Sequence, residues 1–249
     1  MSGFQDHFAS VADHYVASRP SYPVALFAWL AEQCPQRILA WDCGTGSGQA
    51  ALALTDHFTQ VWATDGSAAQ IAQAIAHPQI TYRQSVAEQS GLPGATVDLV
   101  VVAQALHWFA LEPFYQEVRR VLKPQGLLAV WSYGRLLLED AAVNAQVQTF
   151  YHALHDYWPP ERCHVESGYQ TLPFPFAQRP APPFAMSLSW NLPHLLRYLR
   201  SWSAVGRYQQ EQGNDPVTAL TPHLQACWGD PERTITINWP LALRVGGLT

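Results

Sequence analysis

Basic residues are scarce in this chain of 249 residues, where 14 lysines and arginines stand against 19 acidic residues. Lys123 is the single lysine, and no run of basic residues occurs. Nucleic-acid binding needs a clustered basic surface, which a formal net charge of −5 does not favour. The sequence therefore predicts no nucleic-acid partner.

Cysteine pairs and long hydrophobic runs are also missing. The four cysteines are scattered and form no C-x-x-C pair, which is typical of free thiols in a reducing compartment. The longest apolar stretch, within residues 97–109, is too short and too polar to cross a bilayer. The first ten residues lack the cationic segment and apolar core of a signal peptide. We expect a soluble, cytoplasmic protein with no membrane partner.

A recognisable metal-binding pattern is missing as well. His152 and His155 lie three residues apart on a predicted helix, and Cys163 and His164 follow. This spacing matches no familiar zinc pattern, and proline-rich sequence follows it. A histidine-rich surface explains the cluster, so we expect no metal.

What the chain does contain is a regular alternation of strand-like and helix-like segments. The predicted strands are 37–42, 60–65, 80–85, 97–104 and 127–134, and the predicted helices are 24–33, 48–58, 68–77 and 113–123. Such alternation favours right-handed crossovers and a parallel sheet covered on both faces. The predicted fold class is α/β, a doubly wound sheet.

One connection departs from this alternation. Residues 86–96, between the third and fourth strands, are too short and too rich in glycine and proline for a crossover helix. In the strand order 3-2-1-4-5 this link must cross roughly 14 Å. An extended chain of that length reaches roughly 36 Å, so the crossing needs no helix.

The pattern changes after Gly134. We expect helices over 141–158, 192–205 and 215–228, and strands over 184–191 and 233–245. No change of composition marks a second domain, so residues 1–249 are interpreted as one domain. Within it, residues 1–22 form an N-terminal arm, and residues 135–181 form an insertion over the ligand edge of the sheet.

A glycine cluster follows the first strand. Asp42 ends the apolar run, and Gly44, Gly46 and Gly48 precede the next helix, where glycines bring backbone N–H groups up to a ligand. The spacing fits neither G-x-G-x-x-G nor a P-loop. Asp42 would repel a phosphate and attract a cation, so the predicted ligand is nucleoside-like and cationic.

These residues resemble a known family. The segment DCGTGSG is similar to the first motif of class I S-adenosylmethionine-dependent methyltransferases, and VWATDGS, YRQSVAEQSGLP, VDLVVVAQALHWF and VLKPQGLLAVW resemble the later motifs in order. The resemblance covers residues 10–134 well. It implies a Rossmann-like, seven-stranded sheet in the order 3-2-1-4-5-7-6, a lid insertion after strand five, and S-adenosylmethionine as cofactor.

The resemblance also implies the cofactor site. Asp42 and the glycine loop would hold the methionine end, and Asp65 would take both ribose hydroxyls, because a carboxylate offers two acceptor oxygens. Several relatives have an aspartate where this chain has Val86, so adenine recognition would use backbone groups near Val86 and Ala87, or Ser85. The complete set also includes Gly44, Thr45, Gly46, Gly48, Gly66, Glu88 and Gln104.

The segment YVASRPSYP, residues 15–23, resembles the entry segment of small-molecule methyltransferases that include the trans-aconitate type. Tyr15 offers an aromatic face and a hydroxyl, and Arg19 a fork that matches a carboxylate. Both are predicted at the methionine end of the cofactor. The alternative is that Arg19 and Tyr22 only hold the arm on the core.

His107 and Trp108 follow the fourth strand, at the edge where doubly wound sheets bind ligands. His107 is the candidate catalytic residue, because an imidazole can take a proton from an acceptor hydroxyl. The alternative is a packed aromatic pair that caps the strand.

The predicted function is methyl transfer from S-adenosylmethionine to a small molecule, a small carboxylic acid or a hydroxyl compound. Two alternatives stay open. One is a non-catalytic module that binds S-adenosylmethionine. The other is an NAD-dependent oxidoreductase, against which the missing third Rossmann glycine argues.

Overall fold

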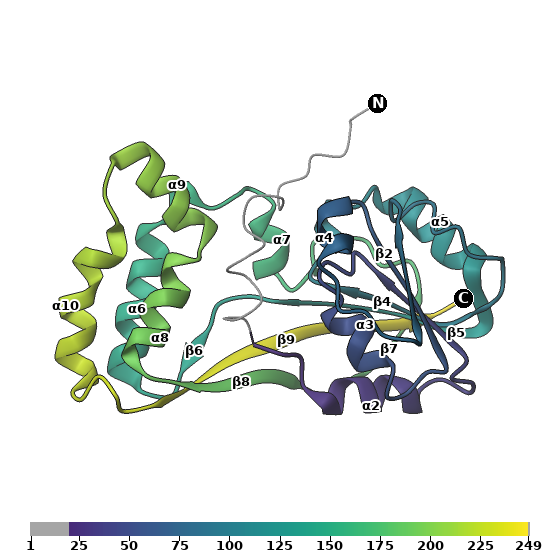
Figure 1. Cartoon of the computed structure of the whole chain (residues 1–249), viewed down its shortest axis with the longest axis horizontal. Helices are drawn as coiled ribbons and strands as arrows, with labels where there is room; N and C mark the ends of the chain where they lie inside the picture. The colour runs from purple at the N-terminus through teal and green to yellow at the C-terminus, as the bar shows by residue number, and fades with distance from the viewer. Residues whose placement is uncertain (1–19, 249) are drawn as a thin grey trace.

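The computed structural model describes residues 20–248, which form an α/β sheet with a helical bundle beyond one end of it (Figure 1). The strands are β1 Leu39–Cys43, β2 Gln60–Asp65, β3 Ile80–Gln84, β4 Val97–Ala103, β5 Leu122–Tyr133, β6 Leu137–Leu138, β7 Ala177–Arg179, β8 Phe184–Trp190 and β9 Ile235–Gly247. The α-helices are α2 Val24–Glu32, α3 Gln49–Leu54, α4 Ala68–Ala72, α5 Leu111–Val121, α6 Ala141–Ala153, α7 Arg162–Glu166, α8 Leu192–Arg200, α9 Ser203–Gln212 and α10 Pro216–Trp228. Two 3-10 turns, η1 Leu106–Trp108 and η2 His155–Tyr157, follow β4 and α6.

The sheet has the order β3-β2-β1-β4-β5-β9-β6, and its first five strands are parallel. This confirms the predicted α/β class and the order 3-2-1-4-5. The link between β3 and β4 contains no helix, as its length and composition predict. The last strand, β9, is antiparallel to β5 and lies between β5 and the earlier strand β8, as the resemblance implies.

The predicted number of seven strands is wrong, because the sheet of the described residues has nine. The cause is the length of β9, which runs for 13 residues. One side of β9 pairs with β5 and β6, and its other side pairs with β7 and β8. The sequence hides β7, since its three residues lie inside the proline-rich segment 171–184.

Three buried clusters hold these layers together. One lies between the sheet and helices α2 and α3, and a second packs α5 on the other face. In β4, every residue from Val97 to Val102 is buried, as the apolar run after Asp98 predicts for a central parallel strand. The third cluster joins α6, α8 and α10 to the outer parts of β8 and β9.

The region after β5 differs in detail from the sequence prediction. Residues 135–181 contain β6, α6, α7 and β7, and α6 packs against α10. The helical bundle in Figure 1 is therefore built from residues inside and beyond the predicted insertion. The predicted helix 192–205 is interrupted after α8, and α4 ends at Ala72, earlier than the prediction.

Two expectations from the sequence concern the cysteines and the absence of a membrane-spanning segment. The four cysteines are free thiols, with Cys34 and Cys43 buried. Within residues 20–248, no helix combines the length and the apolar character needed to cross a bilayer.

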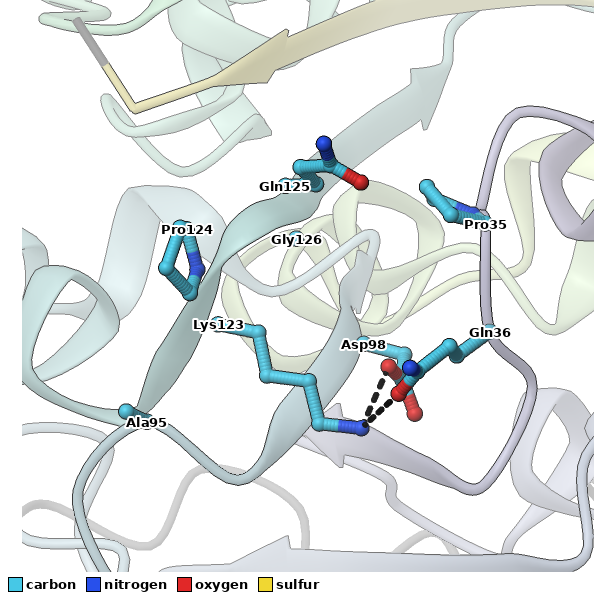
Figure 2. A pocket seen from close by; sticks show the side chains of 8 residues that line it. All are labelled: Pro35, Gln36, Ala95, Asp98, Lys123, Pro124, Gln125 and Gly126. Atoms are coloured by element: carbon cyan, nitrogen blue, oxygen red, sulfur yellow. Dashed lines mark hydrogen bonds and ion pairs between the residues drawn. The ribbon is translucent and has the colours of Figure 1, made fainter.

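A buried ion pair fixes the start of β1 against β4 and β5 at the amino end of the sheet. Figure 2 shows Lys123 reaching Asp98 and Gln36 beside a cavity of about 390 Å³. One Asp98 oxygen accepts from Lys123 Nζ at 2.7 Å. The other accepts from the backbone N–H groups of Ile38 and Leu39 at 2.9 and 3.0 Å. Asp98 therefore accepts hydrogen bonds from three donors, one in β5 and two at the start of β1.

We expect Asp98→Ala to lower the free energy of unfolding by about 3 kcal/mol or more, because it leaves these three donors without an acceptor. Lys123→Met is the matched control and should cost less, since Asp98 then keeps both backbone donors. Denaturant unfolding measures both values. An equal or larger loss in Lys123→Met would contradict the anchoring role of Asp98.

Candidate active site

The glycine loop between β1 and α3 has an unusual backbone. Gly44, Gly46 and Gly48 all have positive φ angles, of 71°, 56° and 86°. A Cβ at Gly44 would lie 2.6 Å from the Ala105 Cβ, and one at Gly48 would collide with the Tyr82 hydroxyl. The loop therefore needs glycine for its conformation and for the close approach of the segment after β4.

Asp42, at the end of β1, is fully buried beneath this loop. The hydroxyl of Thr45 donates to Asp42 Oδ2 at 2.5 Å, whereas Oδ1 has no partner among the described residues. Burial raises the pKa of Asp42 to about 7, against the lowering effects of Thr45 and the Ala51 backbone. An unpaired buried acceptor of this kind fits a cationic donor such as an ammonium group.

Asp65, at the end of β2, holds two turns together. Its Oδ2 accepts from the Gly46 backbone N–H at 2.8 Å, and its Oδ1 accepts from the Ser67 N–H at 2.9 Å. The carbonyl of Gly66, between them, accepts from Gln84. A carboxylate offers two acceptor oxygens, which is the chemistry that a vicinal diol needs. The ribose role of Asp65 stays a prediction.

The predicted adenine segment, residues 85–88, follows β3. The Ser85 hydroxyl donates to the Gln89 carbonyl, which commits its hydrogen to the local turn. Val86 is 42% exposed and Ala87 is buried. Glu88 accepts from the Ala110 N–H at 2.8 Å and so ties this segment to the loop before α5. Of residues 85–88, Val86 is the exposed one.

Gln104, which follows β4, has a φ of 61°. Its side-chain amide donates to the Tyr133 carbonyl at 3.1 Å and accepts from the Tyr133 N–H at 2.7 Å. These two bonds extend the pairing of β4 with β5. Gln104 thus has a structural function in this state, and its predicted contact with the cofactor remains a prediction.

His107 lies in η1, directly after the β4 edge, and it is partly exposed. Its Nδ1 lies 3.0 Å from the hydroxyl of Tyr169, and its ring packs at 4.7 Å from the Trp108 ring. Burial, followed by the nearby His164 and Arg162, lowers the pKa of His107 to about 4. Trp108 is 38% exposed, so it is not a core residue.

The glycine loop, Asp65 and the β4 edge therefore meet in one place, since Gly44 and Ala105 nearly touch and Gly46 bonds Asp65. Tyr15 and Arg19 lie outside the described residues. The described part of the chain contains no group of three or more potential metal ligands. Sequence reasoning missed Tyr169, because nothing in its local pattern indicates a contact with His107, 62 positions earlier.

This arrangement suits a cationic nucleoside. A buried carboxyl with an unpaired oxygen lies under a loop of backbone N–H groups, and a second carboxylate follows at the end of the neighbouring strand. The residues therefore fit a cationic nucleoside such as S-adenosylmethionine, and the individual contacts of Asp42 and Asp65 stay predictions.

Comparisons with known proteins agree with this chemistry. Residues 41–130 match the family described as the methyltransferase domain. A protein of Dictyostelium discoideum, named as a methyltransferase, is 32% identical over 247 residues and covers 96% of this chain and 93% of its own length. A methyltransferase of Aspergillus candidus is 31% identical over 166 residues, and the chain spans about half of its length.

Solved structures give the same result. A protein from Anaeromyxobacter dehalogenans, described as a type II methyltransferase, is 48% identical with a TM-score of 0.88. That match covers 92% of this chain and 97% of the other. Sequence and structure together leave no support for an oxidoreductase. The chain belongs to the class I S-adenosylmethionine-dependent methyltransferases.

Proposed function

We propose that this enzyme methylates a small molecule, either a small carboxylic acid or a hydroxyl compound, which binds beside His107. The observation that carries the proposal is the contact of Gly44 with Ala105. It brings the glycine loop next to the segment that carries His107. Both follow neighbouring parallel strands, β1 and β4, at the edge where doubly wound sheets bind ligands.

In this proposal, Asp42 and the loop from Gly44 to Gly48 hold the methionine end of the cofactor. Asp65 binds the ribose, and residues 85–88 flank the adenine. The sulfonium of S-adenosylmethionine supplies an activated methyl group, so the chain's own residues mainly position both partners and exclude water. Correct placement contributes roughly 7–11 kcal/mol toward lowering such a barrier.

The far wall of the acceptor site comes from the predicted lid, residues 135–181. Its helix α7 packs against β5, where the Ser132 hydroxyl donates to the Val165 carbonyl. The turn after α7 carries Tyr169 to His107. This placement supports the interpretation of the segment as a cover of the acceptor site. The arm residues Tyr15 and Arg19 are proposed to complete the methionine end.

S-Adenosylhomocysteine should bind in a calorimeter, and NAD should not. Asp65→Ala should weaken this binding by about 1.5–3 kcal/mol, the usual effect of losing a hydrogen bond to a charged group. Asp56→Ala, an exposed acid in the turn before β2, is the matched control and should bind normally. Unchanged affinity in Asp65→Ala would remove Asp65 from the cofactor site.

Affinity for S-adenosylmethionine should rise as the pH increases through about 7, the pKa of Asp42. The methionine ammonium favours the ionised carboxyl, whereas the folded protein without ligand keeps the proton below that pH. Asp42→Asn should bind more weakly above pH 7 and lose this dependence. Calorimetry across the range measures both, and an identical pH profile in Asp42→Asn would contradict the assignment.

The same pKa has a consequence for stability. Because the folded-state pKa lies above the ordinary value of about 3.9, the folded state retains a proton that the unfolded state releases. The stability that Asp42 contributes is complete below pH about 4 and is lost as the pH rises through about 7. Asp42→Asn should therefore gain stability relative to wild type between these values, as denaturant unfolding would show.

His107→Ala should impair methylation while leaving S-adenosylhomocysteine affinity intact. A panel of small carboxylic acids and phenols identifies the acceptor first. If His107 orients a carboxylate, its loss should raise the acceptor KM about 10–100-fold. If it acts as a base toward a hydroxyl, kcat should fall about 10²–10⁴-fold. A lower melting temperature with normal activity of the folded fraction would make His107 structural.

A further inference from the structure

Tyr169 is the buried partner of His107, and several contacts fix its position. It lies in the turn after α7 with a φ of 61°, which is unusual for a residue with a side chain. Arg244 of β9 donates to the Tyr169 carbonyl at 2.7 Å and to the Leu172 carbonyl at 2.9 Å. The strained conformation is therefore held by the sheet, and it directs the hydroxyl to His107.

The proton in this contact can be assigned from the hydrogen-bonding capacity of each group. Burial raises the pKa of Tyr169 well above its usual value, so the hydroxyl keeps its single hydrogen. The hydrogen bond of this hydroxyl within the described residues is the one with His107. The hydrogen itself needs an acceptor, and the described residues provide His107 Nδ1, at 3.0 Å.

The opposite assignment leaves a buried donor unsatisfied. If His107 carried its proton on Nδ1, the Tyr169 oxygen would accept that proton in the contact with His107. Its own hydrogen would then have no acceptor among the described residues. An unpaired buried donor is costly, so the tautomer with the proton on Nε2 is favoured.

We infer that Tyr169 is a positioning residue that holds His107 as the neutral Nε2–H tautomer, so that His107 offers the methyl acceptor a hydrogen-bond donor instead of a base. The inference rests on the proposed function only in placing the acceptor beside His107. It assigns Tyr169 a function in the reaction without contact with the transferred methyl group.

The surroundings of His107 support a neutral ring. Arg162 and His164 of α7 and its own burial all disfavour the imidazolium form. Arg162 is itself bonded to the Tyr151 hydroxyl at 2.9 Å and lies 3.8 Å from Glu166. A neutral N–H donor suits an oxygen that is already deprotonated, such as a carboxylate. An acceptor that arrives as a hydroxyl would have to lose its proton to another group.

Nitrogen NMR of the ¹⁵N-histidine-labelled full chain tests the tautomer directly. His107→Gln identifies the His107 signals among the ten histidines. We expect the wild-type spectrum near neutral pH to show a neutral ring with the proton on Nε2. Tyr169→Phe keeps the buried ring but removes the hydroxyl, so His107 should become a mixture of both tautomers.

Tyr115→Phe is the matched control. Tyr115 is also buried, and its hydroxyl donates to the Pro173 carbonyl of the same segment, at 2.6 Å, instead of to His107. It should leave the His107 signals unchanged. Melting temperatures of both variants report any general loss of folding. If Tyr169→Phe does not fold, the tautomer of His107 in the wild-type protein alone tests the inference.

Kinetics with an acceptor from the panel give a second test. Tyr169→Phe should raise the acceptor KM more than it lowers kcat, and Tyr115→Phe should do neither. A wild-type ring with its proton on Nδ1, or an unchanged tautomer in Tyr169→Phe, would overturn the inference. Failure to bind S-adenosylhomocysteine would instead overturn the proposed cofactor site, because the NMR result needs no ligand.

Discussion

The structure of the candidate site depends on the close approach of two loops. The glycine loop after β1 and the segment after β4 meet because these strands are parallel neighbours, and Gly44 has no room for a Cβ against Ala105. The chain passes from β3, at the outer end of the parallel strands, to β4 without a helix. The cofactor loop and His107 therefore share one surface because of strand order.

The parallel strands were predictable because each element carries its own pattern, and their order followed from the resemblance. The run from Leu99 to Val102 is apolar throughout and becomes part of a strand buried on both faces. The strand β7 was not predictable, since Ala177–Arg179 pairs only where β9 offers a free edge. Its local sequence is rich in proline, and the pairing comes from a partner almost 70 positions away.

The site residues also divide into those that the sequence could predict and those that only the structure shows. The positions of Asp42, Asp65 and the glycines follow from motifs in which residues close in sequence act together. The contacts of Gln104 with Tyr133 and of His107 with Tyr169 join segments that are 29 and 62 positions apart. No local periodicity indicates such pairs, because tertiary packing alone brings them together. The same limit explains why the sequence suggests a base at His107, whereas the contact with Tyr169 leads us to propose a hydrogen-bond donor.

Burial acts in opposite directions on Asp42 and His107. It raises the pKa of Asp42 to about 7 and lowers that of His107 to about 4, because in each case it disfavours the charged form. Between these two pH values, both groups are mostly neutral in the protein without ligands. In the proposed reaction, Asp42 gains its negative charge when a cationic ligand compensates it, and His107 stays neutral and donates a hydrogen bond. His107 then supplies no charge to the methyl acceptor, so a positive methyl donor next to an acceptor that is already negative is the combination that this pair of residues favours.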